Sequence, residues 1–204
     1  MLILASASPR RIEMLQNAGY DPVVKPASII EKLPFEMPPE TATMFLALTK
    51  AAAVCDDIIS KSGRGHADWP PRDSELTVVA ADTVVICDGR IIGKPAGEDE
   101  AYSILSHLRN RSHHVITGCC VIKCDNSTGT LSPVSRQCFF EDTEVFFKNF
   151  SLDELREYVK TDEPYDKAGG YAVQGTFGQY IDHINGNLDN VIGLPLTRLK
   201  QYID

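Results

Sequence analysis

Apolar positions along the chain follow two spacings, which predict a mixture of strands and helices. Runs typical of β-strands occur at Leu2–Ala5, Thr77–Cys87, His114–Cys124 and Cys138–Phe147. Helical spacing predicts helices over 9–18, about 41–57, roughly 98–108 and about 151–160. Because strands and helices do not alternate strictly, we predict an α/β protein with a mixed sheet.

Residues with strong positional preferences mark the ends of several predicted elements. Ser8 stands at the N-cap position of the first helix, with Pro9 at its first turn. Asp88-Gly89 is a hairpin signal that leads into Arg90–Ile92. Ser151 and Glu154 have the spacing of a capping box. These signals mark where two of the predicted helices begin and where a hairpin turns.

The segments between these elements predict loops within one domain. Ile59–Glu75 is rich in Gly, Pro, Ser and charge, which favours an exposed loop. Asp166–Gly193 is rich in glycine and is expected to be mostly loop with a few strand residues. The length of 204 residues suits one domain, or two tightly joined lobes, and we predict a single domain over 1–204.

Composition narrows the functional classes. The chain has 20 Lys and Arg against 28 Asp and Glu, a net charge of −8, which disfavours a nucleic-acid binder. No apolar run is long enough to span a bilayer, and the N-terminus lacks a signal-peptide pattern, so we expect a soluble, cytoplasmic protein. The six cysteines form no C-x-x-C pair and are expected to be small core residues in a reducing compartment.

Asp82 is the most informative polar residue, because it interrupts the apolar run of the strand Thr77–Cys87. Burying a carboxylate is costly unless it is paired, hydrogen-bonded or bound to a metal. A strand that accepts this cost usually has a chemical reason to do so. Asp82 is therefore a candidate general base toward water, or a ligand to Mg²⁺.

Several cationic residues together indicate an anionic ligand. Arg10 and Arg11 follow Ser8 at a turn into a helix, where free N–H groups favour a phosphate. Lys50 interrupts an otherwise apolar helical stretch, and together with Lys94 and Lys167 it could add charge to a polyphosphate pocket, although each lysine alone also fits an ordinary solvated residue. Glu31 offers a second carboxylate for a metal. The P-loop, dinucleotide-binding and nucleophile-elbow motifs are absent from the sequence.

The ordered set of motifs resembles the Maf family of nucleoside triphosphate pyrophosphatases, also called septum-formation inhibitor-like proteins. The matching blocks are Leu4–Arg11, Lys50-Ala51, Ala81–Val84, Gly93–Pro95, Arg111–His113, Tyr165–Gly175 and Asn190–Pro195. They occur in family order and cover nearly the whole chain. Three departures stand out: Leu108–Arg111 replaces the usual L-S-G-R, Glu31 is the single carboxylate where the family has an acidic pair, and the loop after residue 59 is long.

The resemblance implies a two-lobed mixed-sheet architecture similar to inosine triphosphate pyrophosphatases, with a deep nucleotide cleft. It implies hydrolysis of a triphosphate to a monophosphate and pyrophosphate with a divalent cation, Mg or Mn, and it is consistent with a homodimer. Asp82 would be the catalytic base, and Glu31 with Asp82 would bind the metal. The substrate-binding positions would be Ser8, Arg10, Arg11, Lys50, Thr83, Lys94, Lys167 and Gln174.

The resemblance also narrows the substrate. In the dTTP/UTP branch the selective positions correspond to Arg10, Thr83 and Gln174, and all three match. The Gln174 amide can accept from the N3–H of uracil or thymine and donate to a ring carbonyl. Two other readings stay open: a nucleotide-binding regulator of cell division with little or no turnover, and a phosphatase that releases inorganic phosphate.

Overall fold

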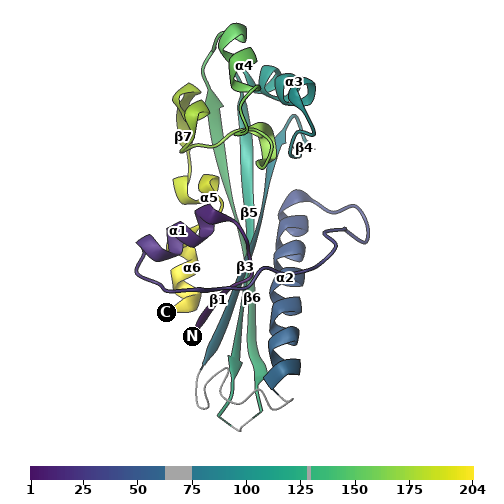
Figure 1. The fold of residues 1–204 in the computed structure, drawn as a ribbon, viewed down its shortest axis with the longest axis vertical. Helices are drawn as coiled ribbons and strands as arrows, with labels where there is room; N and C mark the ends of the chain where they lie inside the picture. Colours follow the sequence, from purple (N-terminus) through teal and green to yellow (C-terminus); the bar gives the residue numbers. More distant parts are fainter. Residues whose placement is uncertain (63–74, 128–129) are drawn as a thin grey trace. The chain divides into compact units, whose positions relative to one another are not determined.

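The computed structural model describes residues 1–62, 75–127 and 130–204 (Figure 1). The strands are β1 (Leu2–Leu4), β2 (Val23–Val24), β3 (Leu76–Cys87), β4 (Arg90–Ile92), β5 (Ser112–Asp125), β6 (Ser132–Phe147) and β7 (Ile181–Asn185). The α-helices are α1 (Pro9–Asn17), α2 (Pro39–Ser62), α3 (Glu98–Leu108), α4 (Leu152–Tyr158), α5 (Leu188–Ile192) and α6 (Leu196–Ile203). Two 3₁₀ turns, η1 (Ala168–Gly170) and η2 (Thr176–Tyr180), complete the described part.

The strands form one mixed sheet in the order β2-β1-β3-β5-β6-β7, with β4 paired to β3. β1 is parallel to β2 and β3, whereas β3 with β4 and β6 with β7 are antiparallel. The predicted α/β class with a mixed sheet is thus confirmed. The chain divides into two compact units, and the divisions fall inside β3, β5 and β6 and directly before α6.

Unit 1 comprises Met1–Asp82, Gly118–Phe140 and Leu196–Asp204. Its core is made by α2 against β1, β3 and β5, with α1 and α6 on the other side of the strands (Figure 1). The helix buries a line of mainly small residues: Ala47, Ala51, Val54, Cys55 and Ile58. The larger apolar side chains of this helix, Met44, Phe45 and Leu48, are only partly buried, because the small side chains face the sheet and let the helix approach closely.

Unit 2 comprises Thr83–Thr117 and Glu141–Pro195. Its main core is aromatic and lies among α3, α4 and the two 3₁₀ turns. Phe177 is fully buried there and contacts the rings of Phe147, Phe150 and Tyr158. Large rings bury much apolar surface, so the 3₁₀ turn η2, which carries Phe177, packs closely against the core of unit 2.

Two predicted loop regions differ from the structure. α2 continues through residues 59–62, since Ile58 is buried and Lys61 pairs with Asp57 one turn earlier, while residues 63–74 of the predicted loop lie outside the described residues. Asp166–Gly193 contains η1, η2, β7 and α5, more regular structure than predicted. None of the helices within the described ranges is long and apolar enough to cross a membrane.

Candidate active site

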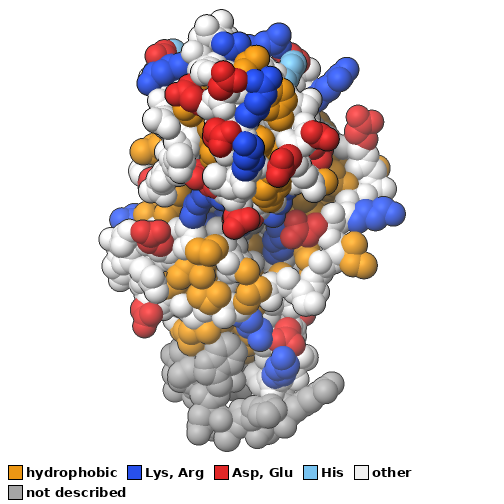
Figure 2. All heavy atoms as spheres, turned by 45° about the horizontal axis from the view of Figure 1, so that its top comes forward, with side chains coloured by type: hydrophobic (Ala, Val, Ile, Leu, Met, Phe, Trp, Pro, Cys, Tyr) orange, Lys and Arg blue, Asp and Glu red, His pale blue; other side chains and the backbone are white. Residues whose placement is uncertain are grey.

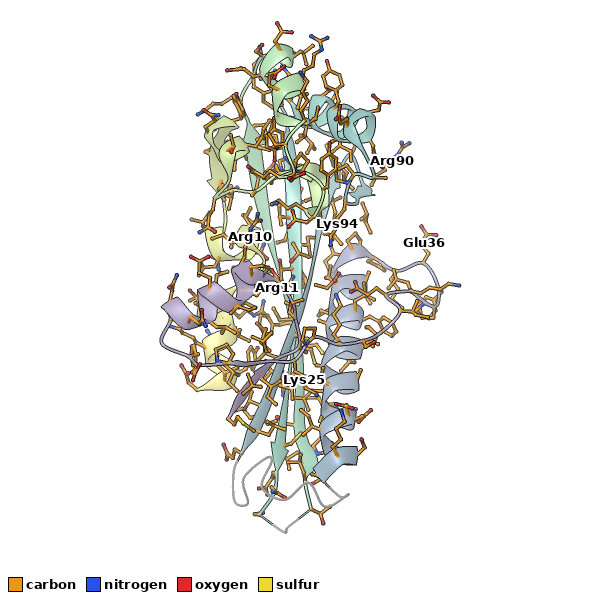
Figure 3. All side chains as sticks on the ribbon, viewed as in Figure 1. Arg10, Arg11, Lys25, Glu36, Arg90 and Lys94 are labelled. Atoms are coloured by element: carbon orange, nitrogen blue, oxygen red, sulfur yellow. The ribbon has the colours of Figure 1, made fainter. Side chains whose placement is uncertain are left out.

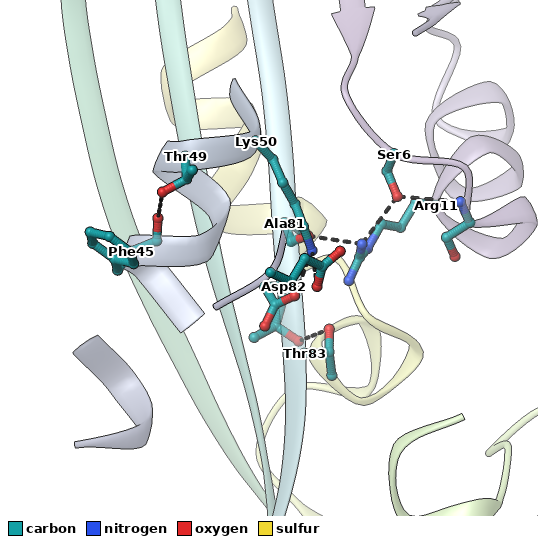
Figure 4. A network of polar contacts seen from close by, with 11 residues as sticks. Ser6, Arg11, Phe45, Thr49, Lys50, Ala81, Asp82 and Thr83 are labelled. Atoms are coloured by element: carbon teal, nitrogen blue, oxygen red, sulfur yellow. Dashed lines mark hydrogen bonds and ion pairs between the residues drawn. The ribbon is translucent and has the colours of Figure 1, made fainter. Parts of the chain in front are cut away.

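Asp82 lies in β3 at the end of the run Leu76–Ala81, and its side chain is only 13% exposed. Lys50 extends from α2, and its Nζ lies 2.7 Å from Asp82 Oδ1 (Figure 4). The Lys50 side chain is equally enclosed, at 12% exposed. The cost of burying the carboxylate is therefore offset by a direct ion pair. Both residues were selected from the sequence because each interrupts an apolar segment.

Glu31 reaches the same ammonium. Its Oε2 lies 3.1 Å from Lys50 Nζ, and its side chain is 53% exposed. Two carboxylates that contact one ammonium are necessarily close to each other. Carboxylate oxygens are the ligands that Mg²⁺ and Mn²⁺ prefer, so Glu31 and Asp82 fit a divalent cation.

The turn between β1 and α1 places the predicted phosphate-binding arginines (Figure 3). Ser8 is the N-cap residue as predicted, with Pro9 in the first turn, but its side chain makes no capping bond. Instead, the hydroxyl of Ser6 accepts hydrogen bonds from the Ser8 N–H (3.3 Å) and from Arg11 Nη1 (3.1 Å). Ser6 thereby fixes the backbone from which Arg10 and Arg11 extend.

Arg11 joins this turn to the strand that carries Asp82. Its Nη1 donates to the carbonyl of Ala81 at 2.9 Å (Figure 4). Burial lowers the pKa of Arg11, and the neighbouring carboxylates of Asp82 and Glu31 oppose that shift. Unit 1 thus brings Asp82, Lys50, Glu31 and Arg11 close together.

Thr83 is held by a chain of hydrogen bonds within unit 2. Its hydroxyl lies 3.0 Å from that of Thr117, which donates to the carbonyl of Asn190 at 3.0 Å. Asn190 is fully buried and donates to Val115 O and Thr143 Oγ1. The predicted selectivity residue therefore has a rigid polar support.

Lys94 and Lys167 lie on segments that are bonded to each other. Lys94 is exposed after β4, and the Gly93 carbonyl accepts from Gly169 N–H at 3.0 Å. The side chain of Lys167 is 12% exposed, pairs with Asp166, and donates to Glu163 O at 2.6 Å. Gln174 is exposed. The structure thus ties the Lys94 and Lys167 segments together and presents Gln174 to solvent.

A second grouping of metal-ligand types occurs in unit 2. Among the described residues, Cys87, Asp88 and His107 are the group of three whose ligand atoms lie within 4.8 Å of one another. His107 Nε2 and Arg111 Nη1 both contact Asp88 Oδ2, at 2.9 and 3.0 Å. Asp88 therefore also joins Arg111 and His107 in an ion-pair network at the β3–β4 turn.

Two supporting residues, one in each unit, were not among the site residues predicted from the sequence. Ser6 acts through Arg11, and the S-x-S-P spacing could have indicated it. Glu163 contacts Lys167 through its backbone carbonyl, and no side-chain pattern reports such a contact. The charged candidates were found because charge interrupts an apolar pattern, whereas supporting residues leave no such signal.

The whole chain matches a known family. The sequence model described as Maf-like protein matches residues 1–204. The dTTP/UTP pyrophosphatase of Desulfitobacterium hafniense is 38% identical over 201 residues, which cover 98% of this chain and 83% of the relative. That of Agathobacter rectalis is 38% identical over 201 residues, 98% and 94% of the two chains. That of Desulforamulus reducens is 40% identical over 198 residues, 97% and 92% of the two chains.

Proposed function

The chain belongs to the Maf family, and from that premise we propose that it is a pyrophosphatase that hydrolyses dTTP and UTP to the monophosphate and pyrophosphate. Relatives that bear this activity as their name align with nearly its full length. The observation that carries the proposal is the enclosed carboxylate of Asp82, held against Lys50 with Glu31 and Arg11 beside it. A structural ion pair would not need a second carboxylate and an arginine at the same point.

In the proposed reaction Asp82 acts as general base. Its carboxylate accepts a proton from a water molecule while the water oxygen bonds to the α-phosphorus. The bond between the α-phosphorus and the bridging oxygen breaks, and its electron pair leaves with pyrophosphate. Lys50 holds the carboxylate in place, and Arg10 and Arg11 offset negative charge on the phosphates.

Glu31 and Asp82 would hold the divalent cation, which when bound neutralises phosphate charge. The two carboxylates satisfy the chemical preference of Mg or Mn, and Lys50 contacts both of them in the structure. We expect the protein to bind Mn²⁺ through this pair. Glu31→Gln should weaken Mn²⁺ binding measured by electron paramagnetic resonance.

Selection of the base is assigned to Arg10, Thr83 and Gln174. Uracil and thymine present an N3–H donor, whereas cytosine presents an acceptor at that position. The Gln174 amide can serve the first pattern by accepting from N3–H and donating to a carbonyl. We therefore expect turnover of dTTP and UTP to exceed that of CTP and 7-methyl-GTP; a preference for 7-methyl-GTP would contradict the assignment.

Asp82→Asn tests the proposal directly, because the amide keeps the shape of the carboxylate but cannot accept the proton. Pyrophosphate release from UTP should fall by roughly 10²–10⁴-fold. Asp21→Asn, at an exposed position of the same unit, is the matched control and should leave release unchanged. Retained UTP binding with negligible release in wild type and variant alike would favour a regulator, and inorganic phosphate as the product would indicate a phosphatase.

The remaining expectations follow from the resemblance. We propose a cytoplasmic enzyme that acts on free nucleotides, without nucleic acid or membrane, and that forms a homodimer. Analytical ultracentrifugation of the purified chain tests the dimer: a monomeric mass at micromolar concentration would exclude it.

A further inference from the structure

Glu163 connects both ends of the segment that carries Lys167 and Gln174. Its backbone carbonyl accepts a hydrogen bond from Lys167 Nζ at 2.6 Å. Its carboxylate Oε2 accepts from the N–H of Thr176 at 3.1 Å, two residues beyond Gln174. One half-buried residue therefore contacts the chain on either side of the segment.

Gly175 makes room for this carboxylate. A Cβ at Gly175 would lie 1.9 Å from Glu163 Oε1 and 2.9 Å from the Cβ of Ala172. The backbone of Gly175 has φ −95°, a conformation that alanine adopts without strain. Glycine is therefore required at this position by the lack of space for a side chain and not by the backbone conformation. The carboxylate of Glu163 fills most of that space.

Tyr158 completes the support from α4. Its hydroxyl lies 3.3 Å from Glu163 Oε1 and 3.1 Å from the carbonyl of Gly170. The ring of Tyr158 packs on Phe177, which is fully buried. The carboxylate of Glu163 is therefore anchored to the aromatic core of unit 2 and is not a mobile surface charge.

We propose that Glu163 is a positioning residue for base selection, because it fixes the backbone of Gly175 and Thr176 and so aims the amide of Gln174. The inference rests on the proposed function, since it takes Gln174 to contact the pyrimidine. Lys167 is bound through the carbonyl of Glu163, which side-chain substitution leaves in place. Loss of the carboxylate should therefore affect recognition of the base more than the chemical step.

The first test measures steady-state kinetics and calorimetric binding of UTP and CTP. Misaiming of a contact group costs roughly 10–100-fold, so Glu163→Ala should lower kcat/KM for UTP by that factor, mainly through KM, and should leave CTP nearly unchanged. Glu163→Gln should recover part of the UTP preference, because its amide oxygen can still accept from Thr176. Glu157→Ala, at an exposed ion pair of α4, is the control and should change neither nucleotide.

The second test uses the contact between Glu163 and Gly175. Gly175→Ala should reduce the UTP preference strongly in the wild-type background and less in Glu163→Ala, since the 1.9 Å clash with the carboxylate is then removed and only the 2.9 Å contact with the Cβ of Ala172 remains. Additive effects of the two substitutions, or an unchanged ratio of UTP to CTP in Glu163→Ala, would overturn the inference.

The two readouts separate the inference from the proposed function. Absence of pyrophosphate release in wild type, with UTP binding that weakens in Glu163→Ala, would reject the enzyme and retain the positioning role. Normal pyrophosphate release by the wild type, with unaltered selectivity in the variants, would retain the enzyme and reject the positioning role. Thermal unfolding of each variant identifies a loss of fold. If Glu163→Ala does not fold, the ratio of UTP to CTP turnover in Glu163→Gln decides whether the positioning role holds.

Discussion

At the scale of single residues, the ion pair of Lys50 and Asp82 is expected to contribute to stability as well as to activity. Lys50→Met leaves an enclosed carboxylate without its counter-ion, which should lower the free energy of unfolding by up to about 3–5 kcal/mol. Lys50→Met combined with Asp82→Asn should recover part of this loss, because a neutral amide needs no counter-ion. Urea denaturation of the two single variants and the double variant measures this; a loss in the double variant equal to the sum of the two single losses would show that the pair carries no coupling.

His113 should make the stability of the protein depend on pH. It is 1% exposed, its Nε2 lies 2.6 Å from the Tyr171 hydroxyl, and burial lowers its pKa to about 4 from 6.5. Between these values the unfolded chain binds a proton that the folded protein does not. The free energy of unfolding should therefore be highest above pH 6.5 and fall by about 3 kcal/mol toward pH 4.

Denaturation at a series of pH values checks this dependence on His113. His113→Phe with Tyr171→Phe removes the titrating ring without leaving an unpaired hydroxyl, and should flatten the slope between pH 4 and 6.5. His114→Gln, the neighbouring half-exposed histidine, should keep most of it. A slope that persists in the His113 variant would assign the effect to other groups.

Site residues could be predicted from the sequence where a charged side chain interrupts an apolar segment. Asp82 and Lys50 each interrupt an apolar segment, so both could be selected, but only the structure gives the 2.7 Å contact between them. Glu163 has ordinary surroundings in the sequence, and its role depends on a contact with Thr176, 13 residues away, that no local pattern encodes. Ser6 contacts Arg11, 5 residues away, and the S-x-S-P spacing is the local signal that indicates it.

At the scale of secondary structure, the contact of β5 with α2 depends on Gly118. A Cβ at Gly118 would lie 2.4 Å from Met44 N and from Thr43 C, which are backbone atoms of α2 and cannot rotate away. Gly118→Ala should therefore separate helix and strand and lower the free energy of unfolding by about 3 kcal/mol or more. Gly97→Ala, where nothing lies within 4 Å, should have a much smaller effect in the same thermal denaturation.

Elements with long apolar patterns or clear caps were predicted well. α3 was expected at roughly 98–108 and spans Glu98–Leu108, and the capping box of Ser151 with Glu154 begins α4. α5 and α6 escaped prediction because they are 5 and 8 residues long, and each buries a single residue, Asn190 or Leu199. Such short helices depend on tertiary contacts and not on their own pattern.

At the scale of the whole molecule, charge is mixed instead of segregated on the face in Figure 2, where Lys and Arg side chains are interspersed with Asp and Glu. The net charge is −8, although the predicted substrate contacts include Arg10, Arg11, Lys50, Lys94 and Lys167. An acidic body with locally placed cations attracts a compact anion at short range and repels an extended polyanion.

This distribution predicts discrimination between pyrophosphate and a polynucleotide. Pyrophosphate should compete with UTP and raise its apparent KM, because it presents the phosphates that the cationic side chains bind. A single-stranded oligonucleotide at the same phosphate concentration should leave KM unchanged, since the acidic surface repels it. Raising the salt concentration should increase KM for UTP, because the attraction is electrostatic and partly screened. If the oligonucleotide inhibits as strongly as pyrophosphate, the protein has a basic surface that binds extended polyanions, and this prediction is wrong.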